Sequence, residues 1–210
     1  MPTMYLPEDF RESDAETVAE IIRANPLGAL VTVQDGALVA DHIPFLFDRA
    51  RNRLFAHVAR ANPLWSRADR NQDALVIFQG GDRYVTPSWY PSKRRSGKVV
   101  PTWNYEVVHV YGRLVAQDDS LAAREVVETL TRQHEERRPA PWAVGDAPQD
   151  YVATLLKAIV AIEIDITGIA AKRKLSQNLR EEDREGVIAG LSDEDDEGAR
   201  EMARRMREQG

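Results

Sequence analysis

The chain has 210 residues, of which 43% are hydrophobic and 30% charged, as expected for a soluble globular protein that buries a core. It contains no cysteine, which excludes disulfides and thiolate metal sites and predicts a cytoplasmic location. No apolar run reaches the roughly 18 residues that span a bilayer, so no membrane partner is expected. The net charge of −6 arises in residues 181–210, which carry 5 basic and 11 acidic side chains. The neutral body does not favour DNA as a partner, because DNA-binding domains usually present a basic face, although local basic patches leave direct contact open.

Residues 13–25 are predicted to form the first helix. Ser13 and Glu16 have the spacing of a capping box, and apolar residues follow at helical spacing. Two further helices are predicted, at residues 119–137 and from about residue 147.

The strand patterns begin at residues 28–48, where two β-rich runs flank the pair Asp35-Gly36, a typical hairpin turn. Further strands are predicted at residues 53–60, 73–80, 107–117 and 158–169. About six strands with few helices between them do not fit an alternating parallel sheet. They predict a mainly β, α+β fold: an antiparallel barrel with peripheral helices.

Three histidines, His42, His57 and His109, lie in predicted strands and are the first candidates for a metal site. None has a second histidine or a carboxylate at zinc-motif spacing, so hydrogen-bonded core or pocket histidines are favoured and no metal is expected. Nucleophile elbows, phosphate loops and dinucleotide fingerprints are missing from the sequence. The commonest hydrolases and nucleotide-driven enzymes are therefore excluded.

The segment "HVARANPLW", residues 57–65, combines a strand end, Arg60 and a predicted helix start. Asn62 is a good cap and Pro63 suits a first turn. A helix N-terminus beside an arginine favours an anion such as phosphate. A capped helix with a solvated arginine explains the same pattern, and spacing alone does not separate the two.

Aromatic side chains gather in residues 83–93 and 101–105. They are Tyr84, Trp89, Tyr90, Trp103 and Tyr105. Such residues can pack at strand edges, stack across a dimer interface or form the walls around a planar ring.

At these motifs the chain resembles the PaiB-type FMN-binding negative transcriptional regulators, a branch of the FMN-binding split-barrel proteins. The resemblance runs nearly end to end, through "MYLPEDF", "ADHIPF", "HVARANPLW", "YVTPSWYPSK", "VVPTWNYEVVHVYG" and "KLSQN". The chain reads "AKRKLSQN" where the family usually has "GKWKLSQN". Ala171 and Arg173 therefore stand in place of a glycine and a tryptophan.

The resemblance implies an antiparallel split barrel that forms a homodimer and holds FMN at the dimer seam. Residues expected to serve the phosphate are Arg60, His57, Asn62 and Lys174. Residues expected to line the flavin ring are Trp103, Asn104 and Tyr105. Residues expected to close the site are Gln177 and Asn178, with His42 as a second-tier candidate.

The implied function is flavin-responsive regulation, and no catalytic residue is predicted. A flavin-dependent oxidoreductase with flavin-reductase or pyridoxamine-phosphate-oxidase-like chemistry is an alternative, because flavin chemistry needs few protein groups. A haem-binding split barrel is another, with His57 or His109 as the ligand.

The predicted domains are a split-barrel domain at residues 1–180 and a charged helical tail at 181–210. Residues 192–208 place acids first and arginines late, with Ser192 as the expected cap, an order that suits a helix dipole. Their narrow apolar stripe predicts a peripheral, weakly docked helix.

Overall fold

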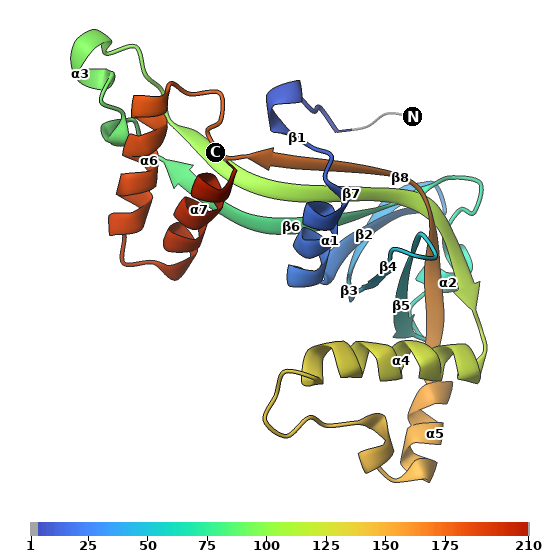
Figure 1. Ribbon diagram of the computed structural model, residues 1–210. Helices are drawn as coiled ribbons and strands as arrows, with labels where there is room; N and C mark the ends of the chain where they lie inside the picture. The colour runs from blue at the N-terminus through green and yellow to red at the C-terminus, as the bar shows by residue number, and fades with distance from the viewer. Residues whose placement is uncertain (1–3, 210) are drawn as a thin grey trace. The chain divides into compact units, whose positions relative to one another are not determined.

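The computed structural model describes residues 4–209, which form two compact units (Figure 1). Within those residues, unit 1 comprises 4–21, 79–108 and 170–209, and unit 2 comprises 22–78 and 109–169. Three long strands contribute residues to both units: β6 (Ala74–Val85), β7 (Thr102–Gln117) and β8 (Ile159–Lys174).

The remaining strands are short and lie in the first sixty residues. They are β1 (Arg11–Glu12), β2 (Leu27–Gln34), β3 (Ala37–Pro44), β4 (Leu46–Asp48) and β5 (Arg53–Ala59). The hydrogen-bonded order is β3-β2-β6-β7-β8-β5-β4, with β1 paired to β8. The β1–β8, β2–β3, β2–β6, β4–β5 and β5–β8 pairs are antiparallel. Over residues 4–209 the sheet is not closed, since β3 and β4 end the order. The predicted mainly β, antiparallel fold is confirmed.

The β2–β3 hairpin forms where the sequence predicts it. Asp35 has φ 50° and Gly36 has φ 82°, so both turn residues adopt the left-handed conformation of a type I′ turn. That turn matches the twist of the flanking strands and fixes the register from Leu27↔Pro44 to Gln34↔Ala37. Along β2 every second residue is buried, which gives unit 2 one side of its core.

Helices cover parts of unit 2. They are α2 (Leu64–Arg67), α4 (Ser120–Glu135), the 3-10 turn η3 (Val144–Asp146) and α5 (Gln149–Lys157). Helix α4 buries Val126 and Leu130 in a cluster with Leu46 and Ala161 of the sheet. The helices predicted at 119–137 and from 147 are therefore confirmed.

Helix α1 (Ala15–Ala24) also forms as predicted, but a different residue caps it. The Asp14 carboxylate accepts a hydrogen bond from the Thr17 backbone amide at 2.7 Å. The predicted box of Ser13 and Glu16 is wrong by one position, because aspartate caps as well as serine and stands nearer the first turn.

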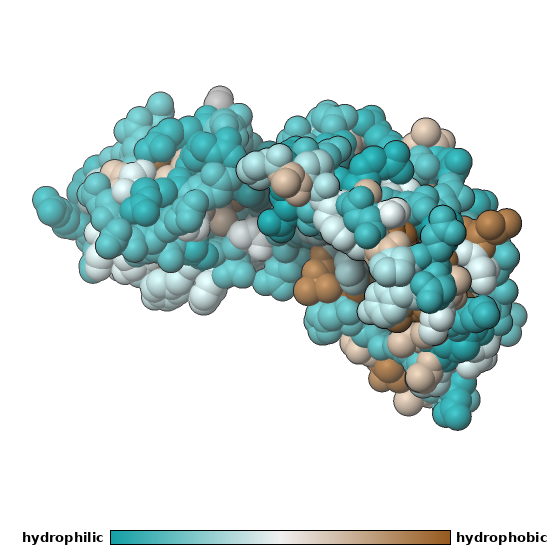
Figure 2. Space-filling model, turned by 90° about the horizontal axis from the view of Figure 1, so that it is seen from below, coloured by the Kyte–Doolittle hydropathy of each residue, from teal (hydrophilic) through white to brown (hydrophobic). Residues whose placement is uncertain are grey.

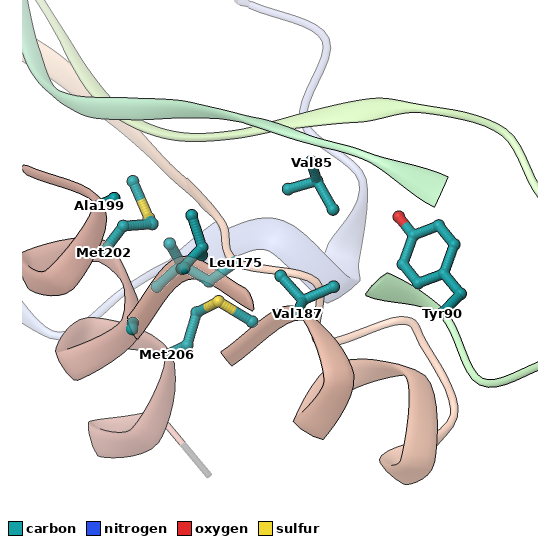
Figure 3. Close-up of a cluster of buried hydrophobic side chains, with 9 residues drawn as sticks. Val85, Tyr90, Leu175, Val187, Ala199, Met202 and Met206 are labelled. Atoms are coloured by element: carbon teal, nitrogen blue, oxygen red, sulfur yellow. The ribbon is translucent and has the colours of Figure 1, made fainter. Parts of the chain in front are cut away.

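The remaining helical elements lie in unit 1. They are η1 (Glu8–Phe10), η2 (Pro87–Trp89), α3 (Lys93–Ser96), α6 (Glu181–Asp193) and α7 (Glu197–Glu208). Helices α6 and α7 lie side by side (Figure 1) and share one hydrophobic cluster. Figure 3 shows Met202 and Met206 of α7 facing Leu175 and Val187 in that cluster.

The C-terminal helices differ from the sequence prediction in two ways. Met202 is 1% exposed and Met206 is 0% exposed, so the expectation of weak docking is wrong: both thioethers fill the unit 1 core. Ser192 lies inside α6, and Asp196 caps α7 by accepting a hydrogen bond from the Ala199 amide at 2.7 Å.

Figure 2 shows one face of the molecule, coloured by hydropathy. On the face seen in Figure 2, hydrophilic side chains predominate and hydrophobic ones form small separate patches. Among residues 4–209, no helix combines the length and the apolar character needed to cross a membrane.

Candidate functional site

Arg60 follows directly after β5 in unit 2, and its guanidinium is held by acceptors of the same unit. Its Nε donates to the Lys157 carbonyl at 2.7 Å, and its Nη2 donates to Asp118 Oδ1 at 2.6 Å and to the Ile159 carbonyl at 3.2 Å. The Asp118 hydrogen bond raises the pKa of Arg60, and in return it lowers the pKa of Asp118. Nη1 has no hydrogen bond to residues 4–209, so one edge of the fork remains available to an anion.

Asn62 organises the turn that follows. Its Oδ1 accepts a hydrogen bond from the Leu64 amide at 2.8 Å, and its Nδ2 donates to Asp41 Oδ1 on β3 at 2.9 Å. Asn62 therefore closes a tight turn before the helix, whereas the predicted cap position is taken by Pro63, which has no side-chain cap. Helix α2 is only four residues long, however, so its dipole adds little to an anion site. Of the two features, the guanidinium of Arg60 is the stronger candidate for binding an anion.

His57 lies on β5, three residues before Arg60. Its ring nitrogen Nδ1 is buried and makes no hydrogen bond to residues 4–209, and the same holds for Asp41 Oδ2. Burial lowers the pKa of His57, so the ring is neutral at neutral pH. A buried polar atom without a partner is uncommon and indicates a group that a ligand or water completes.

His42 is exposed on β3 and points away from this region. Side chains alternate along a strand, so His42 lies on the opposite face from Asp41, which binds Asn62. His42 is thus separated from the Asn62 turn.

The residues predicted to line the flavin ring lie on β7 in unit 1 and are divided between its two faces. Trp103 is 53% exposed and packs edge-to-face on Tyr84, with ring centroids 5.9 Å apart. Tyr105 lies on the same face, with the Lys172 ammonium 5.4 Å from its ring centroid. These two aromatics are accessible to a planar ligand.

Asn104 lies on the other face of β7 and is fully buried. Its Oδ1 accepts a hydrogen bond from the Ser176 hydroxyl at 2.9 Å, and its Nδ2 donates to the Met206 sulfur at 3.4 Å. Both polar groups of the Asn104 side chain thus have hydrogen-bond partners within unit 1. Its neighbour in the pattern, Glu106, is 1% exposed and accepts hydrogen bonds from Arg173 and Arg205.

Arg173 stands where the resembled family usually has tryptophan. Its Nε donates to Glu106 Oε1 at 2.6 Å, and its Nη1 to Glu12 Oε2 at 3.3 Å. The arginine therefore joins β8 to β7 and to the N-terminal segment.

The "KLSQN" segment ends β8 in unit 1, where Ser176 adopts a left-handed φ of 62°. The Lys174 ammonium donates to Thr102 Oγ1 and to the Trp103 carbonyl, the latter at 2.7 Å. Gln177 folds back on the chain, accepting from the Leu175 amide and donating to the Arg173 carbonyl, each at 2.6 Å. Asn178 is exposed and, with Lys174, lines a cavity of unit 1.

His109 lies on β7 in unit 2, with its Nδ1 3.4 Å from the Tyr111 hydroxyl. Burial lowers its pKa. Across residues 4–209 no group of three or more histidine and carboxylate side chains could hold a metal ion.

Two carboxylates that hydrogen-bond predicted site residues, Asp41 and Asp118, are not in the set predicted from the sequence. Asp41 precedes His42 in the "ADHIPF" motif. Its position in that motif could have identified it as a candidate from the sequence. Asp118 is 58 residues from its partner Arg60 and follows directly after β7, so no local pattern connects them.

Residues 4–168 match the model of a protein family described as "Putative FMN-binding domain". The chain belongs to this FMN-binding family. The cofactor predicted from the sequence, FMN, is thereby confirmed. The match ends before the "KLSQN" segment, α6 and α7.

Relatives extend the similarity to the whole chain. The chain is 34% identical over 206 residues to the protease synthase and sporulation protein PAI 2 of Bacillus subtilis, which covers 97% of this chain and 96% of that protein. It is 33% identical to an uncharacterised protein of Emericella nidulans, with 99% of this chain and 98% of that protein covered. The expected PaiB-type family is confirmed.

Solved structures agree in fold. The FAD and heme binding protein from Mycobacterium smegmatis superposes with a TM-score of 0.57 at 20% identity, covering 78% of this chain and 73% of that one. The flavocytochrome Anf3 from Azotobacter vinelandii gives a TM-score of 0.56 at 18% identity, covering 78% and 69%. These superpositions confirm the split-barrel fold predicted for this chain.

On β5 and directly after it, two groups of unit 2 have side-chain chemistry that suits a phosphate. Arg60 offers the open edge of its guanidinium, and the His57 ring has a buried nitrogen without a partner in residues 4–209. Phosphate oxygens accept hydrogen bonds from both kinds of donor.

Proposed function

We propose that this protein is a cytoplasmic, homodimeric regulator whose activity responds to bound FMN. The observation that carries this proposal is the 34% identity to the PAI 2 protein across 97% of the chain, because the relative's name associates it with sporulation. The lack of cysteine is in keeping with the cytoplasm.

In this proposal Arg60 binds the FMN phosphate through the Nη1 edge of its guanidinium, and the His57 ring is a second donor. Asn62 shapes the turn that follows Arg60. Asp118 orients Arg60, because it fixes Nη2 at 2.6 Å. Trp103, which is exposed, and Tyr105, which is half-buried, are the aromatic side chains that unit 1 offers to a planar ring. Asn104 is better placed to support β7 from the interior than to contact the ligand.

Bound FMN supplies a ring that accepts and returns one or two electrons. The protein's own groups bind and orient it. A regulator needs no further acid or base at the ring, whereas an enzyme needs access for an electron donor and an acceptor.

The regulatory role is tested by transcript levels in cells that lack this protein. Wild-type protein is expected to restore the normal transcript pattern, while Arg60→Ala, which weakens FMN binding, is expected to restore it only in part. Unchanged transcripts in cells lacking the protein would contradict regulation.

Air-free mixing of the FMN-bound protein with NADH or NADPH separates regulation from catalysis. The proposal expects slow flavin reduction and no sustained turnover when an electron acceptor is added. Rapid multiple turnover would instead establish a flavin-dependent oxidoreductase.

A further inference from the structure

Lys172 is a buried lysine on β8 in unit 1. It is 8% exposed, and its ammonium donates one hydrogen bond, to the Tyr5 carbonyl at 3.3 Å. Among residues 4–209 no carboxylate forms an ion pair with it. Lysine is almost never buried without a negative charge beside it, because removing an unpaired ammonium from water is costly. The position therefore indicates a counter-charge that the described part of the chain does not supply.

Two tyrosine rings surround the Lys172 ammonium. Its nitrogen lies 5.6 Å from the centroid of the Tyr5 ring and 5.4 Å from the centroid of the Tyr105 ring. Cation–π contacts of this kind offset part of the desolvation cost, but they leave the net positive charge in place. Tyr5 is 84% exposed, so the outer wall of this cage has little packing to hold it against a ligand.

Strand alternation places Lys172 on the side of unit 1 that carries the two aromatic candidates for the flavin ring. Residues 172 and 174 share one face of β8, and residue 173 lies on the other. Lys172 adjoins Tyr105, and the Lys174 ammonium donates to the Trp103 carbonyl at 2.7 Å. The Arg173 side chain points the opposite way, into the interior of the unit. The two lysines therefore lie beside the aromatics proposed for the ring.

The positive charge on this face is not compensated. The Lys174 ammonium is directed to a hydroxyl and a carbonyl, which carry no net charge. Burial, and then the charge of Lys172, lower the pKa of Lys174, so the two ammonium groups repel each other. Two like charges held close together favour a ligand that brings negative charge to them.

A flavin ring acquires a negative charge on reduction. Two electrons and one proton convert the neutral oxidised ring into an anion, and protein charges near the ring tune its electronics. A fixed ammonium attracts the anion more strongly than the neutral ring, so it stabilises the reduced form selectively.

We infer that Lys172 is a further FMN-directed residue, whose ammonium supplies the positive charge that favours the reduced, anionic form of the ring over the oxidised form. The inference rests on the proposed function, because it takes Trp103 and Tyr105 as the aromatics next to the ring. In a regulator that responds to bound FMN, Lys172 thereby sets the potential at which the bound cofactor becomes reduced.

The test is the midpoint potential of FMN bound to the full-length protein, measured by absorbance during an air-free electrochemical titration. Compared with the potential of FMN in solution, it gives the ratio of the affinities for the reduced and oxidised forms. Lys172→Met removes the charge and keeps an unbranched side chain. It is expected to weaken binding of reduced FMN roughly 10-fold more than binding of oxidised FMN, which lowers the potential by about 30 mV for a two-electron couple.

Three further variants separate charge from structure. Lys172→Arg keeps a positive charge and is expected to restore most of the wild-type potential. Lys172→Gln, which has no charge, is expected to give the same shift as Lys172→Met and replaces that variant if it does not fold. Arg94→Met removes an exposed positive charge from α3 of the same unit and is expected to leave the potential unchanged.

A lysine with a purely structural role would affect both forms of FMN equally, so its loss would not move the potential. Equal potentials in the wild type and the uncharged Lys172 variants would therefore overturn the inference, and so would an equal shift in Arg94→Met. Either result leaves the proposed function standing, because the affinity for oxidised FMN and the transcript levels test it separately. A wild-type protein that binds no FMN would refute both.

Discussion

In unit 1 the Ser176 hydroxyl donates a hydrogen bond to the Asn104 side-chain oxygen over 2.9 Å, and both side chains are buried. The pair connects the end of β8 to β7, opposite the face that carries Trp103. The polarity of the "TWNY" motif thus has two purposes: its aromatics face outward, while its amide holds the interior together.

Replacing Ser176 by alanine is expected to lower the free energy of unfolding by about 1–3 kcal/mol, because the Asn104 oxygen then remains buried without that donor. Urea denaturation measures the change. Ser88→Ala is the control, since Ser88 is exposed in the same unit and its loss is expected to cost less than about 0.5 kcal/mol. Equal effects of the two substitutions would show that the buried hydrogen bond does not stabilise the unit.

Met206→Ala tests whether α7 is an integral part of unit 1. The side chain is 0% exposed, so its removal leaves a cavity and is expected to cost about 2–5 kcal/mol. Arg207→Ala, at the next and exposed position, is expected to cost far less. A small change in the free energy of unfolding for Met206→Ala would instead support the weak docking of α7 that the charge pattern predicts.

Acid stability is expected to depend on His57 and His109. Burial lowers the pKa of both rings in the folded protein, so on acidification the unfolded chain takes up protons first, near pH 6.5. Folding stability is therefore lost as the pH falls through about 6.5 toward 5. Asp183 and Asp196 have lowered pKa values in the folded protein. The stability that these two carboxylates give the fold is therefore lost in a separate step, as they become protonated below about pH 4.

The measurement for this prediction is chemical denaturation of the FMN-free protein from pH 7.5 to 5. His57→Gln is expected to reduce the decline, whereas His134→Gln, at an exposed position of α4, is expected to leave it unchanged. If His57→Gln loses as much folding stability between pH 7.5 and 5 as the wild type, protonation of His57 does not cause the loss.

The proposed homodimer is tested by size-exclusion chromatography with light scattering. A mass about twice the chain mass of 23.7 kDa is expected in the FMN-bound protein. A stable species at the chain mass would contradict the dimer.

Local patterns predicted the elements of this fold well. The Asp35-Gly36 pair determines its hairpin because few residues adopt positive φ at both turn positions, and the helical spacing in 119–137 is regular over several turns. The alternation along β7 was equally readable. It places Asn104 on the opposite face of β7 from Trp103 and Tyr105. The alternation therefore argues against the prediction that all three side chains line the same flavin ring.

Long-range pairs could not be predicted in this way. The partners Arg173 and Glu106 are 67 residues apart, and Asp118 is 58 residues from Arg60. The prediction that the C-terminal helix docks weakly was wrong for a different reason. Its composition is dominated by charge, yet four small or flexible side chains on one face, including Met202 and Met206, suffice to fill a core.

The central claim is that FMN binds through Arg60, and titration of the FMN-free protein by flavin fluorescence tests it most directly. Arg60→Ala is expected to weaken FMN binding roughly 10- to 150-fold, because a charge-assisted hydrogen bond to phosphate contributes about 1.5–3 kcal/mol. Arg67→Ala is the matched control, since Arg67 is an exposed arginine seven residues along, paired with Asp35. Unchanged affinity in Arg60→Ala, or an equal loss in Arg67→Ala, would contradict the account.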